Sequence, residues 1–280
     1  MDKVTFFIRP LETLDELHAC EEIQRRAWDT GDEEVVPAHM LLTIAKSGGL
    51  LLGAVGNTPP HPLIGFVLGL LAPKEPPGPK NSPSDLLRHH SHMLGVHPDW
   101  WGHGIGYRLK LAQREAAIAQ GLDLITWTFD PLERRNATLN FAKLGVVCRT
   151  YLPNLYGELD DGLNEGLPSD RFQVDWWLHN PRVERRVAGE RPQADDIIRA
   201  GLPQVNPITL GQDDLTLQDK RLLVEVPAEF QSLKKRADIA LARAWREATG
   251  AIFQAAFSQG YAATEYLYQA GRSYYLLERT

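Results

Sequence analysis

Hydrophobic and polar positions follow strand-like and helix-like periods along most of the chain. Runs of β-branched, aromatic and aliphatic residues predict strands, and apolar residues three and four apart after Thr13, with Glu16 completing a capping box, predict the first helix. Strands are predicted over residues 4–8, 50–55, 63–71, 88–96, 124–129, 146–151, 171–178 and 222–226. Further helices are predicted over residues 37–45, 102–120, 136–144 and 233–257, and a closing hairpin over residues 261–268 and 272–277.

The order of these elements predicts an α/β (α+β) fold in which helices flank a mixed sheet, with a smaller α/β unit at the C-terminus. The stretch after Pro181 is polar and rich in Arg, Asp and Glu, which is typical of a boundary between domains. We therefore expect a first domain over residues 1–181, a linker or irregular segment over residues 182–220, and a C-terminal extension over residues 221–280.

Composition narrows the choice of partners and compartment. The 280 residues include 30 Lys and Arg against 36 Asp and Glu, so the net charge of −6 argues against a nucleic-acid partner. Cys20 and Cys148 are the only cysteines, which excludes a disulfide framework. No apolar run is long enough to span a bilayer and no signal peptide is visible, so we expect a cytoplasmic protein without a membrane partner.

The stretch from Val96 to Tyr107 carries the most chemistry. It places three alternate glycines, Gly102, Gly104 and Gly106, between a predicted strand and a long predicted helix. Backbone N–H groups at such a helix start, aided by the helix dipole, favour an anion such as a phosphate. The spacing matches neither the Walker A motif nor the dinucleotide-binding motif. The sequence therefore predicts a phosphate-binding loop of another kind.

This loop resembles motif A of the GNAT acyl-CoA-dependent N-acyltransferases, in which an apolar strand residue precedes Gln or Arg, two further positions, Gly, one position, and Gly or Ala. Val96 occupies the strand end, and the segment from Trp101 to Gly106 the pyrophosphate loop. A later family motif is matched by Ala137, Phe141 and Gly145. The resemblance spans residues 4–178 and is nearest to a longer bacterial subgroup of acetyltransferases with a C-terminal extension.

The resemblance implies that acyl-CoA is the co-substrate and that no metal is needed. The residues that it assigns to the CoA site are Leu94, Gly95, Val96, Trp101, Gly102, His103, Gly104, Ile105, Gly106, Tyr107 and Asn136. An N-cap role for Asn136 is the open alternative. Two departures matter: Trp101 replaces the usual Gln or Arg, and Phe141 stands where many members place a Tyr that protonates the leaving thiolate.

Catalytic candidates come from residue chemistry near these motifs. His89, His90 and His92 lie on the central strand, and we choose His92 as a base candidate because imidazole titrates near neutral pH. Binding of a metal by the three histidines lacks a supporting Cys or HExxH partner. Tyr151 and Tyr156 follow the second motif and are the candidates for the missing acid, although packing with a bonded hydroxyl is the alternative role for both.

These observations favour an N-acyltransferase that moves an acetyl or related acyl group, such as succinyl, from acyl-CoA to a primary amine of a small molecule, with an amino acid as one option. A non-catalytic acyl-CoA-binding or interaction protein is the main alternative. A dinucleotide-binding oxidoreductase with Asp130 as the ribose ligand is a third, which the glycine spacing opposes. A homodimer is left open.

Overall fold

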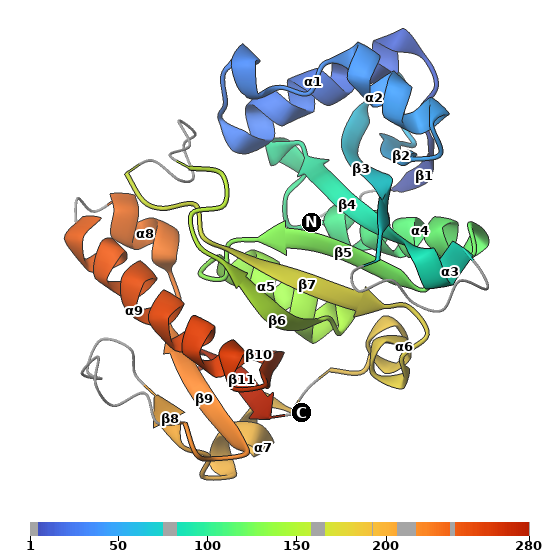
Figure 1. The fold of residues 1–280 in the computed structure, drawn as a ribbon. Coiled ribbons are helices and arrows are strands. Elements are labelled where there is room, and N and C mark those ends of the chain that lie inside the picture. The colour runs from blue at the N-terminus through green and yellow to red at the C-terminus, as the bar shows by residue number, and fades with distance from the viewer. Residues whose placement is uncertain are drawn as a thin grey trace. The chain divides into compact units, whose positions relative to one another are not determined.

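The computed structural model describes residues 5–74, 83–157, 166–191, 193–205, 217–235 and 239–279. Contacts group them into two compact units, one running to Trp127 and the other starting at Thr128. This division differs from the domains expected from sequence, because residues 128–181 group with the C-terminal extension. Figure 1 shows the helices and strands of both units.

Unit 1 contains five strands with helices on both faces of the sheet. Its elements are β1 (Phe6–Pro10), α1 (Leu14–Trp28), the 3-10 turn η1 (Asp32–Glu34), α2 (Ala38–Lys46), β2 (Leu50–Gly56), β3 (Leu63–Pro73), α3 (Pro83–Leu86), β4 (Leu87–Val96), the 3-10 turn η2 (Pro98–Trp100), α4 (Ile105–Ala119) and β5 (Leu124–Phe129), whose last residues, Thr128 and Phe129, belong to unit 2. The strand order is β1-β2-β3-β4-β5. Neighbouring strands are antiparallel except β4 and β5, which are parallel.

The two faces of this sheet have separate cores. On one face, α1 and α2 bury Leu17, Ile23 and Leu41 against Phe66 of β3. On the other face, α4 packs Leu109, together with Ile105, against β2 and β3. The predicted capping box of α1 is present, since Thr13 and Glu16 each bond the other residue's backbone N–H.

Unit 2 contains a second set of strands. Its elements are α5 (Arg134–Ala137), the π-helical turn η3 (Thr138–Leu144), β6 (Val147–Leu152), β7 (Arg171–Trp177), α6 (Pro181–Val187), α7 (Ala194–Arg199), β8 (Gln204–Val205), β9 (Arg221–Val226), α8 (Phe230–Lys235), α9 (Ile239–Ser258), β10 (Tyr261–Gln269) and β11 (Arg272–Arg279). The strand order is β7-β6-β10-β11-β9-β8, with β8 and β9 parallel. The predicted β10–β11 hairpin is confirmed.

An aromatic core holds unit 2 together. The ring of Phe172 on β7 lies 4.7 Å from Phe253 of α9 and 5.2 Å from Tyr275 of β11, measured between centroids. Phe141 of η3 lies 5.4 Å from the same Tyr275. Elements of the first predicted domain and of the extension thus share one hydrophobic core, because β10 pairs with β6 beside them.

The predicted fold class, with helices flanking mixed sheets, is confirmed. In the segment over residues 182–220, expected to be a linker or irregular, the described residues include most of α6 and all of α7 and β8. The helix expected over residues 233–257 overlaps α8 and α9, and residues 236–238, which separate the two described elements, lie outside the described part. Among the described residues, no helix has the length and hydropathy required to cross a bilayer.

Candidate functional site

A β-bulge interrupts β4 at His92. Leu68 of β3 pairs with Met93 and Gly69 pairs with Ser91, so His92 is an extra residue in the ladder. Such a bulge bends the strand and breaks the alternation of its side chains. The period-two argument that placed His90 and His92 on one face therefore does not extend across the bulge.

Strand β4 separates from β5 soon after the two strands begin to pair. The parallel pairing covers only His89 with Ile125 and His90 with Thr126. Beyond His90, the edge of β4 that faces away from β3 has no strand partner among the described residues. The bulge at His92 explains why the pairing of β4 with β5 ends here, because a bulge turns a strand away from the straight course that pairing requires.

Backbone groups of Leu94 and Val96 point to this open edge. The N–H of His97 donates to the carbonyl of Ile64 over 3.0 Å, so the backbone N–H of residue 97 points toward β3. Because successive residues of a strand turn their N–H and C=O groups to opposite sides, those of Val96 and Leu94 turn away from β3. Two N–H donors are thus available for a ligand lying along the edge.

The side chain of Trp101 closes one end of the open edge. Its indole Nε1–H donates to the carbonyl of Val96 over 2.8 Å, and 48% of the residue is exposed. Its backbone N–H donates to Pro98 of η2. Where the family pattern has Gln or Arg, this chain therefore uses a side chain that ties the loop back to β4.

The glycine loop leads from η2 into α4. Gly102 and Gly104 have φ of 85° and 76°, values that favour glycine, and a Cβ added to either meets no atom within 4 Å. The N–H of Arg108 is the first of the helix to donate within it, to Gly104. The preceding N–H groups, from Ile105 to Tyr107, have no acceptor among the described residues, as expected of a first helical turn.

Lys110 of α4 lies where β4 and β5 part. Its Nζ donates to Ser91 Oγ over 2.7 Å and lies 3.8 Å from the centroid of the Trp127 ring. Ser91 and Trp127 are the residues that follow the last bridged pair of β4 and β5. The side chain of Lys110 thus fills the point of separation. Lys110 was not among the predicted site residues, although the positions of Gly106, Lys110, Gln113 and Ala117 have the spacing of a buried helix face.

The histidines of β4 have three different surroundings. His89 is buried, its Nε2 lies 3.0 Å from Gln113 Nε2, and burial together with the charge of Lys110 lowers its pKa to about 3. Burial and the charge of Arg88 lower the pKa of His90 to about 4. His92 is exposed at the bulge. The protein atoms around its ring still displace some water, and this desolvation lowers its pKa. His92 is thus the most accessible of the three.

No cluster of three or more His, Cys, Asp or Glu side chains suited to a metal ion occurs in the described part of the chain. For His89 and His90 the reason is visible: one approaches Gln113 and the other has its Nδ1 3.4 Å from Thr126 Oγ1.

The second motif lies in unit 2 and serves packing. Ala137 and Phe141 are fully buried, and Gly145 ends the π-helical turn with φ of 77°. Glu133 is the N-cap of α5, so the alternative N-cap role of Asn136 is wrong. Asn136 is exposed within the helix, which leaves its side chain accessible.

The two tyrosine candidates differ in accessibility. Tyr151 is buried and its hydroxyl donates to Asp170 over 2.5 Å; burial and this carboxylate raise its pKa. Tyr156 is 52% exposed and its hydroxyl oxygen lies 2.9 Å from Thr128 Oγ1, at the end of β5. The packed role that the sequence left open fits Tyr151, whereas Tyr156 retains an accessible hydroxyl.

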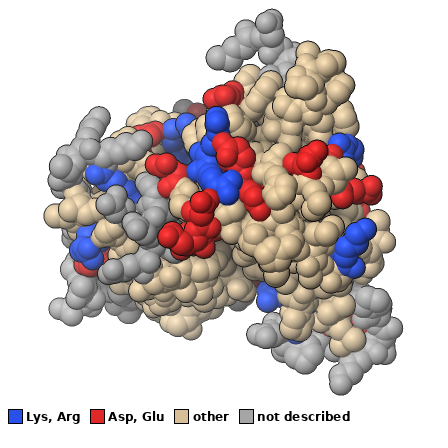
Figure 2. Space-filling model, turned by 90° about the horizontal axis from the view of Figure 1, so that it is seen from above, with Lys and Arg blue, Asp and Glu red and all other residues tan. Residues whose placement is uncertain are grey.

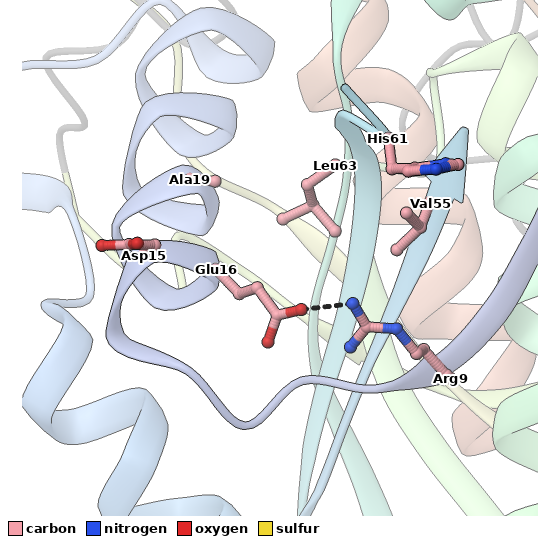
Figure 3. A pocket seen from close by; sticks show the side chains of 7 residues that line it. All are labelled: Arg9, Asp15, Glu16, Ala19, Val55, His61 and Leu63. Carbon is pink, nitrogen blue, oxygen red and sulfur yellow. Dashed lines mark hydrogen bonds and ion pairs between the residues drawn. The ribbon is translucent and has the colours of Figure 1, made fainter. Parts of the chain in front are cut away.

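A hollow of about 190 Å³ near the start of α1 contains none of the predicted site residues (Figure 3). Arg9 points at Glu16 across it, and the carboxylate of Glu16 also accepts the N–H groups of Glu12 and Thr13 over 3.0 Å. Burial alone would raise the pKa of Glu16, but these hydrogen bonds lower it to about 2. Arg9 and Glu16 in this hollow are therefore already engaged in hydrogen bonds that stabilise the start of α1.

The charge pattern offers no large patch of one sign on the face drawn in Figure 2. Lys and Arg side chains there lie next to Asp and Glu side chains. Helix α1 shows the same mixing, with Arg26 paired to Glu22 at 2.6 Å and Arg25 to Asp32 at 2.7 Å. Binding of a polyanion at such a surface would depend on a local device such as the glycine loop.

Comparisons with known proteins give similarity in structure alone. No protein-family model and no curated protein matches the chain. Among solved structures it is similar to Arabidopsis thaliana NAA60 in complex with a bisubstrate analogue, with 16% identity over 62% of this chain and 99% of that one, at a TM-score of 0.47. It is also similar to the ribosomal-protein-S18-alanine N-acetyltransferase from Escherichia coli (16% identity, 61% of this chain, 92% of that one, TM-score 0.46). A third is an acetyltransferase of the GNAT family from Streptococcus pneumoniae (16% identity, 61% and 98%, TM-score 0.46).

Proposed function

We propose that the protein is an acyl-CoA-dependent N-acyltransferase of the GNAT type. The observation that carries the proposal is the open edge of β4, which ends at Val96 and continues directly into the glycine loop and the first turn of α4. An extended thioester with a pyrophosphate at one end needs backbone donors along a strand and a cluster of N–H groups at a helix start. Unit 1 supplies both on neighbouring residues.

The residues fit the co-substrate. The pyrophosphate of acyl-CoA would accept hydrogen bonds from the amides between Gly102 and Tyr107, where the absence of side chains at Gly102 and Gly104 leaves open space. The part of acyl-CoA beyond the phosphates would lie along β4, where the N–H groups of Leu94 and Val96 would donate hydrogen bonds to it. One of these donors would stabilise the thioester oxygen when it becomes an oxyanion.

The reaction is direct attack of a neutral amine on the thioester carbonyl. The N–C bond forms, the C–S bond breaks, and the thiolate of CoA leaves and takes up a proton. His92, exposed at the bulge and with a lowered pKa, is the proposed base that accepts the proton of the amine. The proposed acceptor is a primary amine of a small molecule, and the proposed compartment is the cytoplasm.

Replacing Gly104 with Asp tests the phosphate site. The carboxylate would lie against the phosphates, so the affinity for acetyl-CoA, measured by calorimetry, should fall by at least about tenfold, equivalent to about 1.4 kcal/mol. A negative charge at a helix N-terminus favours the helix, so the change in affinity is not expected to come from loss of the fold.

Gly121→Asp is the matched control. Gly121 lies just beyond the other end of α4, has φ of 77°, and an added Cβ meets no atom within 4 Å. The Gly121→Asp substitution therefore introduces the same backbone strain and the same negative charge, but at a position away from the glycine loop. Equal acetyl-CoA affinities for the two variants, with both folded by circular dichroism, would refute the pyrophosphate assignment.

Tyr156 is the proposed acid in place of the missing tyrosine of the second motif. Tyr156→Phe removes only the hydroxyl, and loss of a general acid lowers kcat by roughly 10²–10⁴-fold. Tyr151→Phe is the comparison, because its hydroxyl is buried against Asp170. Steady-state turnover at saturating acetyl-CoA should fall far more for Tyr156→Phe. Full turnover by that variant would show that the thiolate leaves without this acid.

A non-catalytic acyl-CoA-binding protein is the second candidate, favoured by Phe141, whose buried ring has no proton to donate. The two candidates separate in one assay series. Thermal shifts with CoA, acetyl-CoA, succinyl-CoA and NAD show which ligand binds the folded state. Release of free CoA in the presence of amino acids, polyamines and short peptides then reports transfer and identifies the class of acceptor.

A further inference from the structure

The segment from Asp130 to Arg134 joins β5 to α5, and the C-terminal extension contacts nearly every residue of it. The strongest contact is made by Arg246 of α9. Its two terminal nitrogens donate to the two carboxylate oxygens of Asp130 over 2.6 and 2.5 Å. Both side chains are buried, and the guanidinium also lies 4.9 Å from the ring centroid of Phe230. A planar guanidinium held in this way fixes both the position and the orientation of the carboxylate.

Neighbouring residues of the segment are bound by other parts of the extension. The Tyr275 hydroxyl donates to the carbonyl of Pro131 over 2.7 Å. Gln231 of α8 donates to the carboxylate of Glu133. The extension also contacts the segment at the surface. Arg134 pairs with Glu229 at 2.7 Å, and its guanidinium lies 4.7 Å from the ring centroid of Tyr268.

Within the segment, a hydrogen bond connects Asp130, which Arg246 binds, to the residues that lead into α5. Asp130 Oδ1, which Arg246 binds, also accepts the N–H of Leu132 over 2.9 Å. Glu133 is the N-cap of α5, and Phe141 of the following π-helical turn packs on Tyr275. The start and the buried face of the second motif are thus both set by residues of the extension.

We propose that the C-terminal extension positions the second motif, with Arg246, Tyr275 and Gln231 as positioning residues that fix the Asp130–Arg134 segment and thereby Asn136. The extension is then part of the support of the second motif, where the resemblance assigns Asn136 as a CoA contact, rather than an appended module. The consequence for CoA rests on the proposed function, whereas the effect on the segment does not.

The test uses the full-length double variant Gln231→Ala/Tyr275→Phe, which removes two anchors and leaves the buried ion pair intact. Hydrogen exchange monitored by mass spectrometry reports opening of the amides from Leu132 to Ala137. Loss of two hydrogen bonds should speed their exchange by about tenfold, while the amides of β9 keep their rates. The affinity for acetyl-CoA, measured well below the melting temperature, should weaken by several-fold.

Arg272→Gln is the matched control, because Arg272 lies on the β10–β11 hairpin that carries Tyr275 but pairs with Glu225 of β9, away from the segment. It should change neither readout. Unchanged exchange between Leu132 and Ala137 in the double variant, or an equal acceleration throughout β9, β10 and β11, overturns the proposal. If the wild-type chain does not bind acetyl-CoA, the proposed function has failed, and the exchange comparison still decides whether the extension positions the segment.

Discussion

Lys110 in unit 1 and Arg246 in unit 2 are both almost fully buried, with 4% and 1% of the residue exposed, yet their partners differ. Arg246 faces a carboxylate that matches its guanidinium in charge and geometry. Lys110 faces a hydroxyl, an amide oxygen and an aromatic ring. The first arrangement is an ion pair; the second is a polar contact, and no carboxylate among the described residues is paired with Lys110.

The pKa shifts follow from this difference. Burial lowers the pKa of Lys110 well below its usual value, since within the described part of the chain no carboxylate offsets the loss of water. Burial also disfavours the charged form of Arg246 and of Asp130, but their mutual attraction prevails, raising the pKa of Arg246 and lowering that of Asp130. Burial alone therefore does not decide whether a side chain stays charged; its partner does.

Asp130→Asn should have the largest effect, because it leaves the buried guanidinium without a counter-charge. The free energy of unfolding in urea at pH 7 should fall by about 3–5 kcal/mol. Since the pKa of Asp130 is lowered in the folded state, the pair stabilises the wild type above the unfolded pKa of about 3.9, and this contribution is lost as pH falls through the folded value. The stabilities of variant and wild type should therefore converge in acid.

The double variant Asp130→Asn/Arg246→Met controls for this interpretation. It removes the buried charge as well, so it should be clearly more stable than the sum of the two single changes predicts. Strict additivity of the single and double variants would show that the two side chains do not stabilise each other.

Lys110→Met should have a smaller effect that depends on pH. The unfolded chain binds the lysine proton up to a pH of about 10.4, whereas the folded chain releases it at lower pH, so wild-type stability gains with rising pH in between. Relative to Lys110→Met, the wild type should gain up to about 1.4 kcal/mol per pH unit in urea unfolding between pH 7 and 9.

Lys46→Met, which removes an exposed lysine of α2, controls for the titration of other groups. Its stability should follow that of the wild type across the same pH range. Parallel pH profiles for Lys110→Met and the wild type would mean that Lys110 keeps its charge inside unit 1, and the contrast with Arg246 would disappear.

Much of the secondary structure could be predicted from the sequence, because its signals are local. The capping box at Thr13, the pairing of β2 with β3 and the hairpin turning at Gly271 all depend on residues near one another in the chain. The residues of the glycine loop could also be predicted, since the positive φ at Gly102 and Gly104 is a property of those positions. The helices α6 and α7 were missed because their short, charged sequences lack a clear apolar period.

The positions of most helices and strands and of the glycine loop follow from local sequence signals, because capping, turn chemistry and hydrophobic period act within a few residues. Three features depend on long-range contacts instead: β4 bulges at His92 and parts from β5, Lys110 fills the point of separation, and Arg246 binds Asp130 across 116 residues of sequence. Such features depend on which strands pair and which side chains lose their water, and no local pattern encodes a partner that is distant in the chain.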